Sequence, residues 1–169
     1  KFLLLQRKGC STRQTKGFHG MFANVANMKN LFFENPNDED IKEIGEIFYL
    51  LDAIIPIDTS DIKEVLEGAD NAIVLHGKAT GRNRCADAIE DAVLHTCAIA
   101  KDYDLFSASS VVIYIRSPKQ EPMLMSENEA INTFVQMFTP ATQWRWGLEE
   151  SNGTAEMRVT IIASNIKKK

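Results

Sequence analysis

The order of apolar segments between residues 59 and 164 constrains the fold more than any other feature of the sequence. Two compact runs rich in β-branched residues, 71–77 and 107–118, are typical of buried strands. Each is followed by apolar residues at helical spacing, from Arg84 to Ala100 and from Ser126 to Phe138. Alternation of strands and helices predicts an α/β fold, in which helices pack on a sheet.

Two more strands are expected near the end of the chain, at 142–150 and 155–164. The sequence SNGT between them predicts a tight turn, so these two strands are expected to form an antiparallel hairpin. The sequence therefore predicts an α/β sandwich: one mixed four-stranded sheet with helices packed on a face.

Capping and breaking residues place the remaining boundaries. A helix is expected over 38–53 and is broken at Pro56, and a short helix begins near Thr59 and ends at Gly68. Ser126 and Glu129 have the spacing of a capping box before the last helix. In residues 1–36, FLLL is compatible with a buried strand and MFANVANMKNLFF has apolar residues close to helical spacing, but a polar, glycine-containing stretch separates them. We therefore divide the chain into an N-terminal segment of uncertain structure, 1–36, and a domain, 37–169.

Composition describes an ordinary globular chain and excludes several classes of protein. Of 169 residues, 44% are hydrophobic and 25% charged, which suits one domain with a sizeable core. The net charge of -4 argues against a generally cationic nucleic-acid binder. No apolar run approaches the length of a membrane span. The three cysteines lack paired spacing, so a reducing, cytoplasmic location is expected.

Charge is unevenly distributed along the chain. Residues 1–33 contain bases and no acid, whereas residues 34–70 contain twelve acids. The bases are Lys1, Arg7, Lys8, Arg13, Lys16 and Lys29. This asymmetry fits either a solvated basic loop or a basic arm that contacts phosphate or an acidic partner.

Chemistry-bearing residues form few recognisable patterns. The cysteines and histidines have no metal-ligand spacing, so no metal site is expected. The sequence HGKATGRNR forms a glycine-containing turn between a strand and a helix, where His76, Arg82 and Arg84 could surround an anion. No defined phosphate-loop motif is present there.

The stretch IPIDTSDIKEVL, residues 55–66, holds two acids at the start of the short helix. Asp58 and Asp61 can be ordinary capping residues, because an acid in the first turn stabilises a helix by about 0.3–1 kcal/mol. They can also be a pair of carboxylates offered to a substrate. The residues alone leave both interpretations open.

Several segments, spread over residues 45–166, resemble the C-terminal domain of the FtsZ/tubulin superfamily, and FtsZ-type cell-division proteins most closely. The stretch from Ile57 to Val93 is similar to the family sequence that runs from an acidic loop through a strand to a turn reading A-S-G-x-x-R-A-x-x-A. The matching positions there are Asp58, Asp61, Ile62, Lys63, Val65, Gly77, Ala79, Gly81, Arg84 and Ala88. SENEAINTFVQMF resembles the helix with L-x-E-V-N-E-A, and AEMRVTIIAS resembles the ending E-x-R-V-T-V-I-A-T.

The resemblance implies a GTP-dependent polymerising cell-division protein that associates head to tail in filaments, with other division proteins as further partners. In that family, the loop before this domain docks onto the GTP site of the next subunit, and its acids position the attacking water. Asp58 and Asp61 stand at those positions and are the expected catalytic residues. GTP and Mg²⁺ are implied only through a nucleotide domain or a neighbouring subunit.

This chain departs from the family in two places. Pro56 and Thr59 replace the Asn and Phe of the acidic loop, and the G-G-G-T-G-T-G phosphate loop is absent from the chain. The chain alone is therefore not expected to bind or hydrolyse GTP. Two alternatives stay open: a stand-alone, non-hydrolysing FtsZ-like interaction module, and a small-molecule α/β enzyme that uses His76, Arg82 and Arg84.

Overall fold

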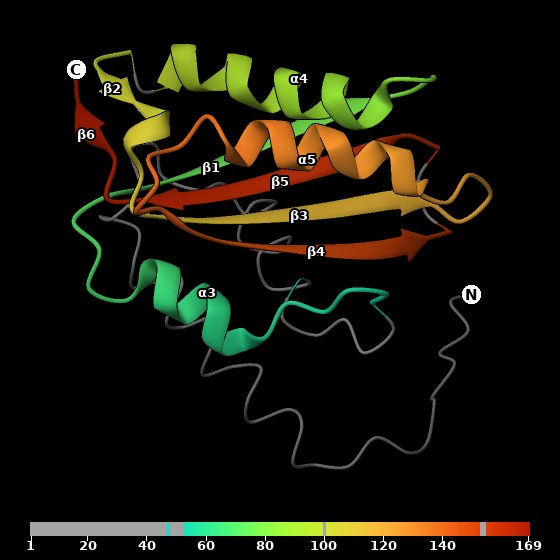
Figure 1. Cartoon of the computed structure of the whole chain (residues 1–169), viewed down its shortest axis with the longest axis horizontal. Coiled ribbons are helices and arrows are strands. Elements are labelled where there is room, and N and C mark those ends of the chain that lie inside the picture. The colour runs from blue at the N-terminus through green and yellow to red at the C-terminus, as the bar shows by residue number, and fades with distance from the viewer. Residues whose placement is uncertain (1–46, 48–52, 100, 153–154) are drawn as a thin grey trace, which may run out of the picture.

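A mixed four-stranded sheet forms the centre of the computed structural model (Figure 1), which describes residues 47, 53–99, 101–152 and 155–169. The helices are α3 (Thr59–Leu66), α4 (Arg84–Ile99) and α5 (Asn128–Val135), with 3-10 turns η2 (Leu105–Ser107) and η3 (Met125–Glu127). The sheet strands are β1 (Ala72–Ala79), β3 (Ser110–Pro118), β4 (Gln143–Ser151) and β5 (Met157–Ser164). Residues 1–36 and the helix expected over 38–53, except Ile47 and Ala53, lie outside the described residues.

The strand order is β1-β5-β3-β4, which confirms a mixed sheet but contradicts the predicted hairpin. Strand β4 pairs in parallel with β3, and β5 pairs antiparallel with both β1 and β3. Ile161 of β5 lies opposite Leu75 on one side and Ile113 on the other. β5 is buried along nearly all its length, so pairing both its edges inside the sheet satisfies its backbone as well as its side chains.

Helices cover both faces of the sheet, whereas the sequence had suggested one (Figure 1). On the first face, α4 and α5 enclose a core that includes Leu75, Ile113 and Ile161. On the second face, α3 covers a smaller core that includes Ile62 and Ile162. Because successive side chains of a strand point to opposite faces, neighbouring residues of β5 contribute to both cores.

Helix α4 approaches β1 closely at Gly77. A Cβ placed on Gly77 would overlap the backbone of Ala88 and Ala92, both of which are fully buried. Small side chains on the helix and no side chain on the strand therefore set the distance between these elements. β1 continues past Gly77 to Ala79, so the turn that leads into α4 comprises residues 80–83 and is shorter than the predicted turn HGKATGRNR.

The chain enters α5 differently from the prediction. Ser126 and Glu129 do not form the capping box; instead η3 precedes the helix, and the Glu127 carboxylate accepts a hydrogen bond from the Leu124 N–H at 2.7 Å. Glu127 is also bound by Arg84 of α4, at 2.9 Å from Nε. The Arg84–Glu127 ion pair fixes the turn before α5. The hydrogen bond from a backbone N–H to a glutamate carboxylate therefore joins Leu124 to Glu127, two residues before the Ser126–Glu129 pair that the sequence predicts.

The last residues form a strand that the sequence did not predict. β6 (Lys167–Lys168) pairs antiparallel with β2 (Tyr103–Asp104) in a separate two-stranded sheet. Asn71 supports this end of the chain, because its side chain accepts from the Ile166 N–H and donates to the Ile166 carbonyl. Among the described residues, no helix combines the length and the apolar character needed to cross a membrane.

Candidate functional site at the start of helix α3

Asp58 and Asp61 form a reciprocal capping box at the exposed N-terminus of α3. The Asp58 carboxylate accepts the Ser60 N–H at 3.0 Å, and the Asp61 carboxylate accepts the Asp58 N–H at 3.0 Å. Asp58 is exposed and Asp61 is half-buried. The capping interpretation is therefore correct, and it leaves both acids at the surface, where an external group can reach them.

Arg145 on β4 lies beside Asp61, a contact that the sequence does not predict. Its Nε is 3.4 Å from Asp61 Oδ1, and both side chains are partly exposed. Solvent screens such a pair, so its contribution to stability is small. The ion pair also restrains the orientation of the Asp61 side chain, because the pair and the capping bond together engage both of its carboxylate oxygens.

The loop that leads to these acids is anchored to the outer edge of β4. Ile55 and Leu148 exchange two backbone hydrogen bonds, of 3.1 and 2.9 Å. Gly147 leaves the space that Ile57 occupies, since a Cβ on Gly147 would lie 2.6 Å from Ile57 Cγ1. On the other side of the acids, Ile62 is fully buried. Backbone pairing and packing therefore hold Asp58 and Asp61 on a fixed part of the surface, with exposed Pro56 two residues before Asp58.

The alternative anion cluster is not assembled, so that prediction is wrong. Arg84 is 5% exposed, and its guanidinium donates to Glu127, Glu121 and the Pro122 carbonyl. His76 lies in β1 with its Nδ1 3.3 Å from Thr160 Oγ1. Alternation along β1 places His76 on the α3 face, opposite to Gly77 and α4. His76 and Arg84 thus lie on different faces of the sheet.

Buried ionisable groups near Arg84 have shifted pKa values. Burial raises the pKa of the Cys85 thiol to about 12, so this thiol stays protonated and unreactive. Burial also acts to raise the pKa of Glu127, but hydrogen bonds from Arg84 and Leu124 and the charge of Arg84 outweigh it, and the net shift is downward. Within the described residues, no group of three or more His, Cys, Asp or Glu side chains could hold a metal ion.

Solved structures share this fold. An empty FtsZ dimer of M. jannaschii matches with a TM-score of 0.59 and 20% identity, over 90% of this chain and 48% of that one. A GTPγS-form protofilament of TubZ from Bacillus thuringiensis serovar israelensis matches with a TM-score of 0.54 and 11% identity, over 78% of this chain and 35% of that one. The chain spans about half the length of FtsZ and less of TubZ. No protein-family model and no curated protein matches the sequence.

Proposed function

Because the chain has an FtsZ/tubulin-like fold, we propose that it acts as the C-terminal domain of an FtsZ-like, GTP-dependent polymerising cell-division protein. In this proposal, Asp58 and Asp61 complete the GTPase site of a neighbouring subunit in a head-to-tail filament. The observation that carries the proposal is their position together at the surface, at the start of α3 and on a loop anchored to β4.

The chemistry that two carboxylates can supply fits this role. A carboxylate accepts a hydrogen bond from water, orients it and draws proton density from it. In phosphoryl transfer, most of the protein's contribution is positioning and charge stabilisation, so orienting the attacking water is a sufficient task. GTP and Mg²⁺ would be held by the neighbouring subunit, and this chain would contribute only the acids.

Local structure supports pre-organisation of the acids. Each carboxylate oxygen has two lone pairs, so a capping bond does not exhaust its capacity to accept hydrogen bonds. Capping fixes the rotamers of Asp58 and Asp61, and Arg145 restrains Asp61 further. Side chains held in this way lose less conformational entropy when they meet a substrate.

The test replaces each acid by its amide in the longest polypeptide that contains this chain. Asn caps a helix about as well as Asp, so Asp58→Asn and Asp61→Asn remove charge while keeping α3 intact. GTP turnover should fall by about 10²–10⁴-fold, while GTP-dependent sedimentation of polymers persists. Glu64→Gln and Glu67→Gln, on exposed positions at the same helix, are the matched controls. Normal turnover in Asp61→Asn would remove Asp61 from the catalytic assignment.

A second candidate is a non-hydrolysing FtsZ-like interaction module, favoured by Pro56 and by the pairing of Asp61 with Arg145. Pro56 offers neither a backbone N–H nor a side-chain hydrogen bond beside the acids. Arg145 partly neutralises Asp61. This module would co-sediment with filaments of a hydrolysing FtsZ, contribute no turnover of its own, and behave identically when Asp61 is replaced by Asn.

A further inference from the structure

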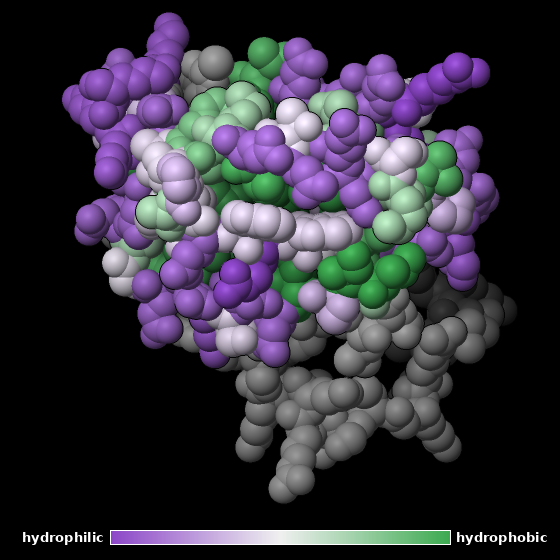
Figure 2. Space-filling view, viewed as in Figure 1, coloured by the Kyte–Doolittle hydropathy of each residue, from purple (hydrophilic) through white to green (hydrophobic). Residues whose placement is uncertain are grey.

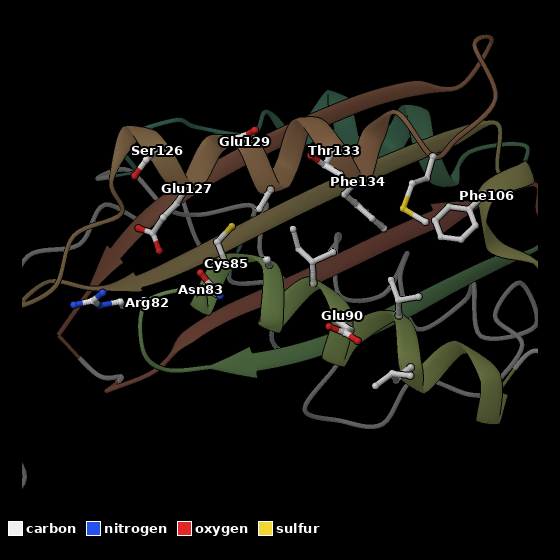
Figure 3. Close-up of a pocket in the computed structure, with 16 residues that line it drawn as sticks. Arg82, Asn83, Cys85, Glu90, Phe106, Ser126, Glu127, Glu129, Thr133 and Phe134 are labelled. Carbon is white, nitrogen blue, oxygen red and sulfur yellow. The ribbon is translucent and has the colours of Figure 1, made fainter.

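A groove of about 720 Å³ lies between α4 and α5, on the sheet face opposite Asp58 and Asp61 (Figure 3). Its lining includes apolar side chains from both helices and from the turn η2, among them Ile89, Phe106 and Phe134. The proposed GTPase site uses none of these residues. The groove is therefore a separate feature of the surface.

The groove has the length and the surface of a helix-binding site. Its α4 wall runs from Cys85 to Leu94, about 14 Å at the rise of an α-helix, which gives room for about two and a half turns of another helix. At one end, Leu94 is 61% exposed and Met137 is 54% exposed. Figure 2 shows apolar side chains between the polar ones along α4 and α5. Exposed apolar side chains beside an apolar groove are typical of a protein interaction site.

Charge on the two walls indicates what kind of partner would fit. Glu90 on α4 and Glu129 on α5 line the groove and are exposed. Neither has an ion-pair partner within the part of the chain that the structure describes. Arg82 lines one end, while the nearby Arg84 is already paired with Glu127 and Glu121. Both long walls thus present unpaired negative charge on either side of an apolar strip.

We propose that this groove binds an amphipathic helix of a partner protein, with an apolar stripe against Ile89 and Phe134 and with Lys or Arg on both flanks. Helices that bind in grooves use apolar anchors at positions i, i+3 or i+4, and i+7, which span about 10.5 Å and fit within the length of this groove. A second copy of this chain fits less well, because pairing two such grooves would bring Glu90 and Glu129 toward their own copies. Like charges in an interface disfavour association.

The test uses two labelled synthetic peptides of 15 residues and the 169-residue chain. Both peptides carry leucine at helical spacing; the polar positions of one are lysine, and those of the other are glutamate. Fluorescence anisotropy should show the lysine peptide binding about tenfold or more tightly than the glutamate peptide. The double variant Leu94→Glu/Met137→Glu should weaken the lysine peptide by about tenfold or more, and circular dichroism should show an unchanged fold because both positions are exposed.

Charge reversal supplies the sharper comparison. Glu90→Lys with Glu129→Lys should reverse the preference between the two peptides. Glu64→Lys with Glu67→Lys makes the same charge change on α3 and its C-terminal cap, on the other face of the sheet, and should leave the preference in place. Equal effects of the two charge-reversal pairs would mean non-specific attraction and would overturn the proposal.

Two other outcomes are also decisive. If the chain sediments as a dimer that Leu94→Glu/Met137→Glu converts to a monomer, and the lysine peptide does not bind, the occupant is a second copy and the proposal is wrong. Asp58→Asn and Asp61→Asn should leave peptide binding unchanged. The helix-binding groove and the proposed GTPase role can therefore fail independently.

Discussion

The buried ion pair between Arg84 and Glu127 is the polar contact whose removal should cost most. Its Nε–Oε1 and Nη2–Oε2 distances are 2.9 and 3.2 Å, and the two side chains are 7% and 10% exposed. It joins the start of α4 to the turn before α5. Arg84→Met removes the cation while keeping an apolar stem, and Glu127→Gln removes the anion while keeping the shape.

The expected cost follows from what each change leaves behind. A single buried charge without its partner costs about 3–5 kcal/mol. After Arg84→Met, the Glu127 carboxylate keeps the Leu124 N–H, so we expect a loss of about 3 kcal/mol. After Glu127→Gln, the guanidinium keeps the Pro122 carbonyl and exposed Glu121, so we expect about 2 kcal/mol. The double variant leaves no buried charge without a partner. Its loss of unfolding free energy should be about 2 kcal/mol smaller than the sum of the two single losses.

Urea unfolding followed by tryptophan fluorescence measures these differences. With a slope of about 2 kcal/mol per molar urea, a loss of about 3 kcal/mol lowers the midpoint by about 1.5 M. Glu156→Gln breaks the more exposed pair with Lys78 and should cost below about 1 kcal/mol, which makes it the control. Single losses that add without coupling, or an effect of Glu127→Gln no larger than that of Glu156→Gln, would refute the reasoning.

The pH dependence of the free energy of unfolding tests the same ion pair in a second way. The pKa of Glu127 in the folded chain lies below its ordinary value, because hydrogen bonds from Arg84 and Leu124 outweigh the opposite effect of burial. A lowered folded-state pKa means that the contribution to stability is present above the ordinary carboxyl pKa and is lost as pH falls through the lowered one. The drop in urea midpoint through this acid range should be smaller in Glu127→Gln than in the unaltered chain.

Three further predictions concern other parts of the fold. Gly77→Ala should lower the free energy of unfolding, measured in urea, by at least about 3 kcal/mol, because the added Cβ overlaps the backbone of Ala88 and Ala92. A loss below about 1 kcal/mol would contradict the observed packing. Cys85, whose pKa burial raises to about 12, should resist iodoacetamide at pH 8 until the chain unfolds, whereas labelling as fast as in urea would show that it is accessible. Asp58→Ala should cost about 1 kcal/mol of stability and Asp58→Asn almost none, and equal losses would argue against the capping role.

The sequence predicted elements whose signals are local. The short helix with Asp58 at its start, the strand before Gly77 and the helix from Arg84 were found from capping, β-branched and periodic residues, and all three are confirmed. The Ser126–Glu129 capping box failed because Arg84, more than forty residues away, holds Glu127. β6 was missed because its two lysines pair through the backbone, without an apolar pattern.

The hairpin prediction is wrong because the burial of β5, and not its proximity to β4 in sequence, decides where it lies in the sheet. A tight turn between two strands usually joins neighbours in a sheet. The run VTIIAS, however, is apolar at four of its six positions and carries no charge, which is typical of a strand buried on both faces. The strand before it carries Arg145, Glu149 and Glu150 and suits an edge. For the site, the two acids were identified from the sequence, but Arg145 and Gly147 could be placed beside them only once the sheet was known.

The position of β5 between β1 and β3 also has a consequence for how the chain acquires its structure. β5 is the last of the four sheet strands to be synthesised, and Ala72 of β1 is separated from its partner Ser164 of β5 by most of the domain. Contacts between residues so distant in sequence slow folding, because a long loop must close before they form. During translation, the edge of β1 that pairs with β5 would therefore remain without its partner strand until residues 157–164 emerge.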